Sequence, residues 1–357
     1  MSRGHKASTA PHITRASRRH FLVGGAATIS APYILTSGAK ASDRLVLVFA
    51  GGSTQVALEE AIIKPFTAET GIPVTIVNTP DMAKLKVQVQ SKTTEWDLFD
   101  WVGPPLMQAG EEGLLEKIEP AVFKDATMFD NPSPHLVGYG FYVGGICWDP
   151  LRNPRAPRNY REFWDVANFP GRRGLRMRAS ETLEIAMLAD GVPPKEIYPM
   201  DLDRAFKSLE RIKPHIRKWV EQTQQTVSLV QTGELDFSYT YLNRAKAARD
   251  SGISLDFSQD QLVVYGSYYV VPKGAPHKDA AMKYLSFLLR PDRLADFCKR
   301  VSVIPGNLKA NAHLDEATKK SLPDPRNPAY AILNNAWWGE NFAKVEPRFK
   351  EFILSSR

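Results

Sequence analysis

The sequence predicts an α/β protein made of two lobes, joined by a hinge that the chain crosses twice, with a ligand cleft between them. First, a chain of 357 residues is longer than one ordinary hydrophobic core requires. Its composition of 43% hydrophobic and 24% charged residues is typical of a globular protein. Second, short strands alternate with helical stretches. Third, two long apolar runs marked by glycine, 137–148 and 261–272, suit strands that leave one lobe and enter the other.

The first lobe shows the alternation most clearly. Continuous apolar runs predict strands at 45–49, 73–77 and 96–102, and apolar residues at helical spacing predict helices at 55–70 and 82–91. Gly71 stands where a helix usually ends in a left-handed residue. Because the connecting loops are short, we expect a parallel sheet with right-handed crossovers.

The second lobe continues the pattern, and the chain then returns to the first. We expect helices near 160–167, 181–190, 201–213, 223–233, 277–290 and 291–300, and strands near 173–178, 235–241 and 253–257. The predicted organisation is lobe 1 over 42–141 and 267–325, lobe 2 over 142–266, and a helical tail over 326–357 that docks across the lobes.

The net charge of +7 comes from the start of the chain. Residues 1–42 contain six basic side chains and no acidic one, and without them 40 basic residues face 39 acidic ones. The sequence therefore gives no reason to expect a nucleic acid or another polyanion as partner.

Residues 1–41 predict a removable export signal. Ser17-Arg18-Arg19-His20-Phe21-Leu22 precedes a short, weak apolar run and then Ala39-Lys40-Ala41, a pattern that resembles a twin-arginine signal. The run is too short for a membrane anchor, and no later segment reaches that length. We therefore expect a soluble periplasmic protein. Cys147 and Cys298 are expected to be two separate buried thiols, although an oxidising periplasm would permit a disulfide.

Candidate ligand groups in the first lobe follow its strands. Ser53 and Thr54 come after the first strand and open a helix, where they serve either as ligand donors or as a plain helix cap. Asp100 and Trp101 end the third strand, where a carboxylate and an aromatic face suit a cation. Trp101 could equally be a core residue.

The second lobe offers two further groups. Glu181 opens a helix, either as a ligand carboxylate or as an acid favoured by the helix dipole. Tyr241, Asn243 and Arg244 follow the strand at 235–241. Arg244 suits a carboxylate or phosphonate ligand, unless it is paired with Asp97, Asp100 or Asp236.

Several stretches in succession resemble the solute-binding proteins of spermidine/putrescine-type ABC importers. They are Glu-Glu-Ala-Ile-Ile-Lys-Pro-Phe-Thr-Ala-Glu-Thr-Gly-Ile-Pro-Val (59–74), Trp96-Asp97-Leu98, Gly113-Leu114-Leu115-Glu116-Lys117-Ile118, Leu188-Ala189-Asp190-Gly191-Val192, Gln231-Thr232-Gly233-Glu234-Leu235-Asp236 and Val271-Pro272-Lys273-Gly274-Ala275-Pro276. The resemblance implies a type II periplasmic-binding fold without catalysis or cofactor. It implies a small-molecule ligand, a membrane permease with its ATPase as partners, and a monomer.

The returning strand departs from that family's pattern. Polyamine binders carry an aromatic residue and then an aspartate there, whereas this sequence has Tyr265 and Ser267. Serine cannot supply the charge that a diammonium ligand needs in a dry cleft. A polyamine-like or other amine-bearing solute remains the favoured ligand on family grounds, and an organic anion or phosphonate is the alternative.

Two other functions occur on the same fold. Ferric-ion binding by the adjacent Tyr268 and Tyr269 is disfavoured, because neighbouring side chains of a strand point to opposite faces. A cysteine-dependent enzyme would need a reactive Cys147, but no His or Lys stands beside it in the sequence to lower its pKa. We therefore expect neither a metal site nor an enzyme.

Overall fold

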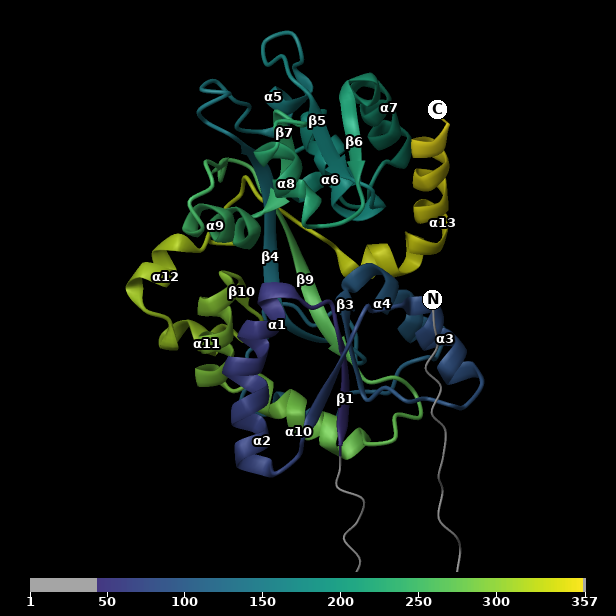
Figure 1. Cartoon of the computed structure of the whole chain (residues 1–357). Coiled ribbons are helices and arrows are strands. Elements are labelled where there is room, and N and C mark those ends of the chain that lie inside the picture. The colour runs from purple at the N-terminus through teal and green to yellow at the C-terminus, as the bar shows by residue number, and fades with distance from the viewer. Residues whose placement is uncertain (1–43, 356–357) are drawn as a thin grey trace, which may run out of the picture. The chain divides into compact units, whose positions relative to one another are not determined.

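Two long antiparallel strands, β4 (Val137–Trp148) and β9 (Val263–Val270), run side by side through the middle of the protein (Figure 1). The computed structural model describes residues 44–355, so the expected export signal at 1–41 lies outside the described residues. Both strands were expected from the glycine-marked apolar runs. Every residue of β9 is buried, and so is every residue of β4 except Tyr142, which is partly buried.

The described strands form one mixed sheet in the order β2-β1-β3-β9-β4-β7-β5-β6, in which β8 and β10 also pair with β4 and β11 pairs with β9. We call β1, β2 and β3 the first half-sheet, and β5, β6 and β7 the second half-sheet. Each half-sheet is parallel, and for the first half-sheet this was expected from the short crossovers. The remaining strands are β1 (Leu45–Phe49), β2 (Val74–Asn78), β3 (Leu98–Val102), β5 (Arg173–Arg176), β6 (Ile216–Val220), β7 (Phe237–Tyr241), β8 (Asp256–Phe257), β10 (Ile304–Pro305) and β11 (Ala331–Ile332).

Helices cover both half-sheets. One buried apolar cluster joins the first half-sheet to α1, α2, α10 and α11, and another joins the second half-sheet to α6, α7 and α13. The α-helices are α1 (Gly52–Leu58), α2 (Lys64–Thr70), α3 (Met82–Gln90), α4 (Gly103–Glu111), α5 (Tyr160–Trp164), α6 (Ala179–Ala189), α7 (Leu202–Ile212), α8 (Gln225–Gln231), α9 (Leu242–Asp250), α10 (Lys278–Leu288), α11 (Pro291–Val301), α12 (Glu316–Ser321) and α13 (Asn335–Leu354). A π-helical segment, η1 (Glu59–Ile63), joins α1 to α2, and short 3₁₀ turns are η2 (Pro120–Phe123), η3 (Pro194–Glu196), η4 (Lys213–His215) and η5 (Leu308–His313).

Several elements were not expected from the sequence, among them β6, α4 and α9. Strand β6 lies at the end of the sheet and exposes Arg217 and Lys218, so its apolar pattern is weak. Helix α4 begins Gly103-Pro104-Pro105, which resembles a turn, but proline is tolerated in the first helical turn because the N–H groups there need no intrahelical partner. Helix α9 was also missed, and the expected helix at 55–70 is interrupted by η1.

Gly144 leaves room for the ring of Tyr239. A Cβ atom on Gly144 of β4 would lie 1.8 Å from the hydroxyl oxygen of Tyr239 on β7. Only glycine therefore lets the Tyr239 ring lie over this strand.

Helix α13 contacts elements that border both half-sheets (Figure 1). Near α4, the Asn335 side chain donates to Asp130 Oδ2 (3.0 Å) and to the Tyr268 hydroxyl (2.7 Å). One turn further on, the buried Trp338 indole donates to Glu184 Oε1 on α6 (2.7 Å). The Tyr198 hydroxyl donates to the same carboxylate oxygen. Burial raises the pKa of Glu184 to about 7, although these hydrogen bonds favour its charged form.

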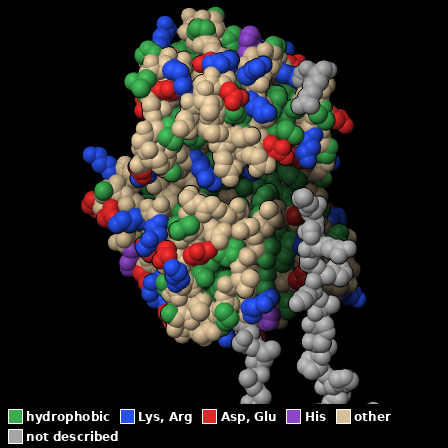
Figure 2. Space-filling view, in the orientation of Figure 1, with side chains coloured by type: hydrophobic (Ala, Val, Ile, Leu, Met, Phe, Trp, Pro, Cys, Tyr) green, Lys and Arg blue, Asp and Glu red, His purple; other side chains and the backbone are tan. Residues whose placement is uncertain are grey.

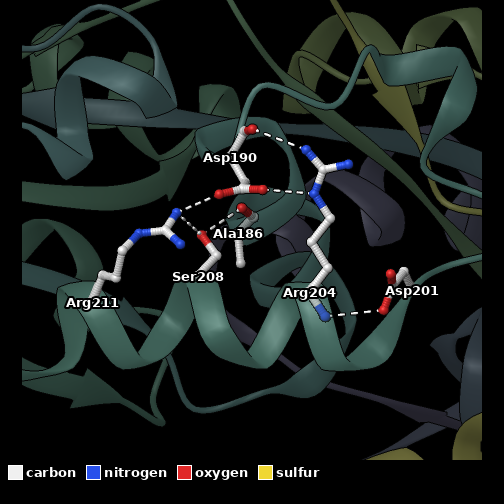
Figure 3. Close-up of polar contacts among 6 residues, drawn as sticks. All are labelled: Ala186, Asp190, Asp201, Arg204, Ser208 and Arg211. Atoms are coloured by element: carbon white, nitrogen blue, oxygen red, sulfur yellow. Dashed lines mark hydrogen bonds and ion pairs between the residues drawn. The ribbon is translucent and has the colours of Figure 1, made fainter.

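A polar cluster fixes α7 against the end of α6 (Figure 3). Asp190 pairs with Arg204 (Nε to Oδ2, 2.6 Å) and with Arg211 (Nη2 to Oδ1, 2.5 Å). Ser208 donates to the carbonyl of Ala186 (2.8 Å). The pKa of Asp190 is lowered, and the hydrogen bond from Arg204 is the largest cause. The stability that this cluster supplies is therefore present at neutral pH. It is lost as the pH falls through the lowered pKa of Asp190.

The described surface carries charges of both signs. Figure 2 shows Lys and Arg interspersed with Asp and Glu over one face, in keeping with a basic excess confined to residues 1–42. Among the described helices, none is long and apolar enough to span a membrane.

The two cysteines are separate buried thiols, as expected. Cys147 lies in β4 and Cys298 in α11, and neither forms a disulfide. Burial raises the pKa of both thiols above the ordinary value.

We predict that Trp338→Ala destabilises the fold by about 3–5 kcal/mol, because it empties a fully buried site and leaves Glu184 without its indole partner. Its neighbour Trp337 is only partly buried, and Trp337→Ala should cost clearly less. Urea unfolding of the two variants measures the difference. Equal losses would show that α13 is not held by Trp338.

Candidate ligand-binding cleft

A cavity of about 650 Å³ opens beside the central strand pair, between the first and second half-sheets. Its size is within the range of small-molecule sites in proteins. It is lined by Phe49, Ala50, Gly51, Thr54, Asn78, Thr79, Pro80, Asp100, Trp101, Val102, Tyr142, Arg176, Met177, Arg178, Glu221, Gln222, Thr223, Gln224, Tyr241, Asn243, Arg244, Tyr265 and Ser267. We call this cavity the cleft.

On the first side of the cleft, a buried carboxylate lies at the end of β3. Asp100 pairs in register with Tyr269 of β9, so Ser267, two residues away on the same strand face, comes within reach. Its Oδ1 accepts hydrogen bonds from Ser267 Oγ and from the Tyr139 hydroxyl, both at 2.9 Å. Among the described residues nothing donates to Oδ2.

The charged form of Asp100 is strongly disfavoured. The residue is 6% exposed, and desolvation raises its pKa from 3.8 to about 7, even though the two hydroxyl hydrogen bonds favour ionisation. Asp100 is therefore divided between neutral and charged forms near physiological pH.

Tyrosines form the floor of the cleft. Tyr142 of β4 and Tyr265 of β9 are register partners, and their rings stack with centroids 5.6 Å apart. Tyr241 lies against Tyr265 at 5.3 Å. Burial raises the pKa of all three phenols, so they are neutral hydrogen-bonding groups at physiological pH.

On the second side, three arginines line the cleft. Arg176 ends β5 and is 3% exposed. Its Nη2 atom donates to Thr223 Oγ1 (3.2 Å). Its Nε and Nη1 atoms have no hydrogen-bond partner among the described residues. Arg178 pairs with Glu181 (Nη1 to Oε1, 3.0 Å). Arg244, at the start of α9, forms no hydrogen bond or ion pair with any described residue, so it is not paired with Asp97, Asp100 or Asp236.

Two more polar atoms on this side have no partner. The Tyr241 hydroxyl and the Asn243 side-chain oxygen are buried and make no hydrogen bond. Buried polar groups are rarely left unsatisfied in native proteins, so their grouping with Arg176 indicates a place where a polar ligand or water completes the contacts.

Glu181 does not line the cleft. Its left-handed backbone (φ 76°, ψ −50°) turns the side chain inward, where it is 1% exposed and accepts from Tyr239 (2.8 Å) as well as from Arg178. Such a conformation is strained for a residue with a Cβ atom and persists only where the surroundings impose it. The carboxylate lies behind Arg178 and orients that guanidinium toward the cleft.

Eight of the ten side chains expected at the site line this cavity: Thr54, Asp100, Trp101, Tyr241, Asn243, Arg244, Tyr265 and Ser267. Ser53 is exposed outside it, and Glu181 lies behind it. Sequence reasoning missed Tyr142, Arg176, Arg178 and the loop 221–224. The only signal for the arginines was their position at the end of a predicted strand directly before a helix.

The geometry also bears on the metal and enzyme alternatives. Tyr268 donates to Asp130 and contacts Asn335, whereas Tyr269 stacks on Tyr139 at 4.7 Å, so the pair cannot converge on one ion. No group of three or more His, Cys, Asp or Glu within residues 44–355 is placed to hold a metal. The Cys147 thiol contacts the carbonyl of Thr226 (3.7 Å) and does not line the cleft.

Comparison with known proteins identifies the family. Residues 61–326 match the model of the bacterial extracellular solute-binding protein family. The chain belongs to this family. It is 32% identical to the γ-aminobutyric acid-binding protein of Pseudomonas aeruginosa (86% of this chain and 90% of the relative), and 24% identical to the spermidine/putrescine-binding periplasmic protein of Escherichia coli (89% and 92%).

The fold is that of the type II periplasmic binding proteins. An ABC transporter substrate-binding protein from Bradyrhizobium japonicum superposes with a TM-score of 0.82 at 33% identity, over 87% of this chain and 99% of that one. This solute-binding protein is therefore the substrate-binding component of an ABC transporter and not an enzyme, as the resemblance implied.

We predict that Asp100→Asn stabilises the ligand-free protein at pH 8. In the unfolded chain Asp100 ionises near pH 4, whereas in the fold its pKa is about 7. Its ionisation therefore opposes folding increasingly as the pH rises from about 4 to 7, by up to roughly 4 kcal/mol above that window. Removing the charge should raise the thermal midpoint at pH 8 and have a clearly smaller effect at pH 5.

Thermal unfolding of the wild type and of Asp100→Asn at the two pH values measures this effect. Part of the gain is offset because the asparagine amide has no acceptor at this position. A midpoint difference that is the same at both pH values would contradict the assignment of a raised pKa to Asp100.

Proposed function

We propose that this protein captures a small ω-amino acid, with γ-aminobutyrate as the model ligand, and delivers it to the membrane permease of an ABC importer and its ATPase. The observation that carries the proposal is the separation of charge across the cleft. The buried carboxyl of Asp100 lies on one side, and Arg176, Arg178 and Arg244 lie on the other. A ligand with an ammonium group at one end and a carboxylate at the other matches both sides.

The arginine side suits the carboxylate. Arg176 has two guanidinium nitrogens without a partner, and Arg244 has no ion pair at all among the described residues. Hydrogen bonds between a guanidinium and a carboxylate are charge-assisted, and they are about twice as strong as neutral ones. A ligand carboxylate would thus satisfy donors that the protein leaves open.

The Asp100 side suits the ammonium group. Asp100 Oδ2 has no donor among the described residues, and Trp101 lines the same wall, where an aromatic face attracts a cation. The tyrosine floor between the two sides provides apolar contact for the methylene groups of the ligand. The 32% identity to a γ-aminobutyric acid-binding protein supports the same ligand class.

A polyamine fits the charges of the cleft less well. A diammonium ligand needs a carboxylate at each end, but Glu181 is engaged by Arg178 and the remaining acid, Glu221, is exposed at the rim. Three arginines would oppose the second ammonium group. The arginines do support an organic anion or phosphonate as a second candidate, and such a ligand would leave Asp100 unused.

The organisation expected from the sequence accounts for capture. We infer that lobe 1 (42–141 and 267–325) carries Asp100, that lobe 2 (142–266) carries the arginines, and that a ligand bridging them shifts the hinge toward closure. The helical tail (326–357) would then act beside the hinge. Residues 1–41 would direct export by the twin-arginine route, and the mature periplasmic protein would act as a monomer.

A ligand screen tests this function. We expect γ-aminobutyrate and 5-aminopentanoate to raise the thermal midpoint of the mature protein, since a ligand at 100 times its Kd stabilises by about 2.7 kcal/mol. Putrescine lacks the carboxylate and glutarate lacks the amine, and each should give a much smaller shift at the same concentration. A larger shift with putrescine, or with glutarate alone, would overturn the ω-amino acid assignment.

We predict that Arg244→Met weakens γ-aminobutyrate binding by roughly ten- to a hundredfold, because it removes one charge-assisted contact to the carboxylate. Arg249→Met is the matched control, since Arg249 lies on the same helix, is exposed and does not line the cleft. Calorimetric titration measures both variants. Equal affinities of the two variants would remove Arg244 from the site.

A further inference from the structure

Asp100 differs from Glu181, the buried acid behind the cleft, because no basic side chain among the described residues contacts it. Its hydrogen-bond donors are the two neutral hydroxyls of Ser267 and Tyr139, and both reach the same oxygen. Glu181, by contrast, holds Arg178. A buried carboxylate without a cationic partner is costly, and such a group avoids the cost by keeping its proton.

Among residues 44–355, no other group in the surroundings of Asp100 titrates near neutral pH. Strand β4 contributes Tyr139 and Tyr142, β9 contributes Tyr269, and α10 contributes Tyr284, and the pKa of each of these phenols is raised by burial. No described histidine lines the cleft.

The other charged side chains that line the cleft do not contact Asp100. Arg244 acts on Tyr142: burial raises the pKa of that phenol, and Arg244 offsets part of the rise. Arg176, Arg178 and Glu221 line other parts of the cavity. Of the described groups on this side of the cleft, Asp100 is therefore the one that gains or loses a proton near neutral pH.

We propose that Asp100 exchanges its proton for the ammonium group of the ligand, so that capture releases a proton and is tightest above neutral pH. The carboxyl O–H bond ionises and the proton passes to water. An N–H group of the ligand ammonium then donates to the carboxylate, and no other bond changes. This coupling rests on the proposed function, because it requires a ligand with an amine.

The expected size of the pH effect on ligand affinity follows from the raised pKa of Asp100. The pKa of Asp100 is about 7 in the empty cleft, and an ammonium group in contact with the carboxylate lowers it. Between the two pKa values the affinity falls as the pH falls. One-proton linkage then predicts binding roughly tenfold weaker at pH 6 than at pH 8. The amine and carboxyl of γ-aminobutyrate resemble those of Lys and Glu and do not themselves titrate in this range.

Calorimetry with γ-aminobutyrate tests the coupling. Titrations at pH 5.5, 6.5, 7.5 and 8.5, each in two buffers that differ in ionisation enthalpy, give both the affinity and the number of protons released. We expect release of close to one proton at pH 5.5 and close to none at pH 8.5. Affinity that is flat across the series with no proton release would overturn the coupling and leave the ω-amino acid function standing.

Glu184 provides the matched control. It is also fully buried with a pKa raised to about 7, but it is bound to Trp338 and Tyr198 and does not line the cleft. Glu184→Gln should therefore keep the wild-type pH dependence and proton release, whereas Asp100→Asn should lose both and bind more weakly. If Glu184→Gln abolished the proton release, the coupling would belong to Glu184 on α6 and not to Asp100. If γ-aminobutyrate bound at no pH, the proposed function would fail and the coupling with it.

Discussion

The antiparallel pairing of β4 with β9 determines where every other part of the molecule lies. Strand β3 attaches to the outer edge of β9 and strand β7 to the outer edge of β4, so each half-sheet is held by one member of the pair. The register that joins Tyr142 to Tyr265 places two stacked rings between the half-sheets. The position of the cleft is thus a consequence of strand pairing, and its floor is part of the sheet.

This arrangement separates the charges of the site along the sheet. Asp100 reaches the cleft from β3 through its contact with Ser267 on β9, whereas Arg176 reaches it from β5. Each charge has its own supporting contacts: hydroxyl groups on β4 and β9 hold Asp100, and Thr223, which follows β6, holds Arg176. The two sets of contacts share no residue.

The sequence predicts the first side of the cleft better than the second. Continuous apolar runs mark the ends of β1, β3 and β9, so Thr54, Asp100 and Ser267 could be placed. The arginines could not, because arginine alternates with apolar residues in 173–178 and the pattern does not tell which of them faces the cleft. Loop 221–224 was missed because β6, which precedes it, is a short edge strand with two exposed basic residues. Glu181 was expected among the ligand groups, but its left-handed backbone turns it toward Tyr239, and sequence spacing gives no sign of that.

The absence of an ion pair between Asp100 and the cleft arginines bears on how a zwitterionic ligand would bind. If Arg244 contacted Asp100, the two groups would neutralise each other and a zwitterion would have to break that pair before it could bind. The tyrosine floor lies between them, and the carboxyl avoids the cost of an unpaired buried charge by holding a proton. In the proposed binding, the arginines meet the carboxylate end of the ligand, and the protonated fraction of Asp100 becomes charged when an ammonium group arrives to meet it.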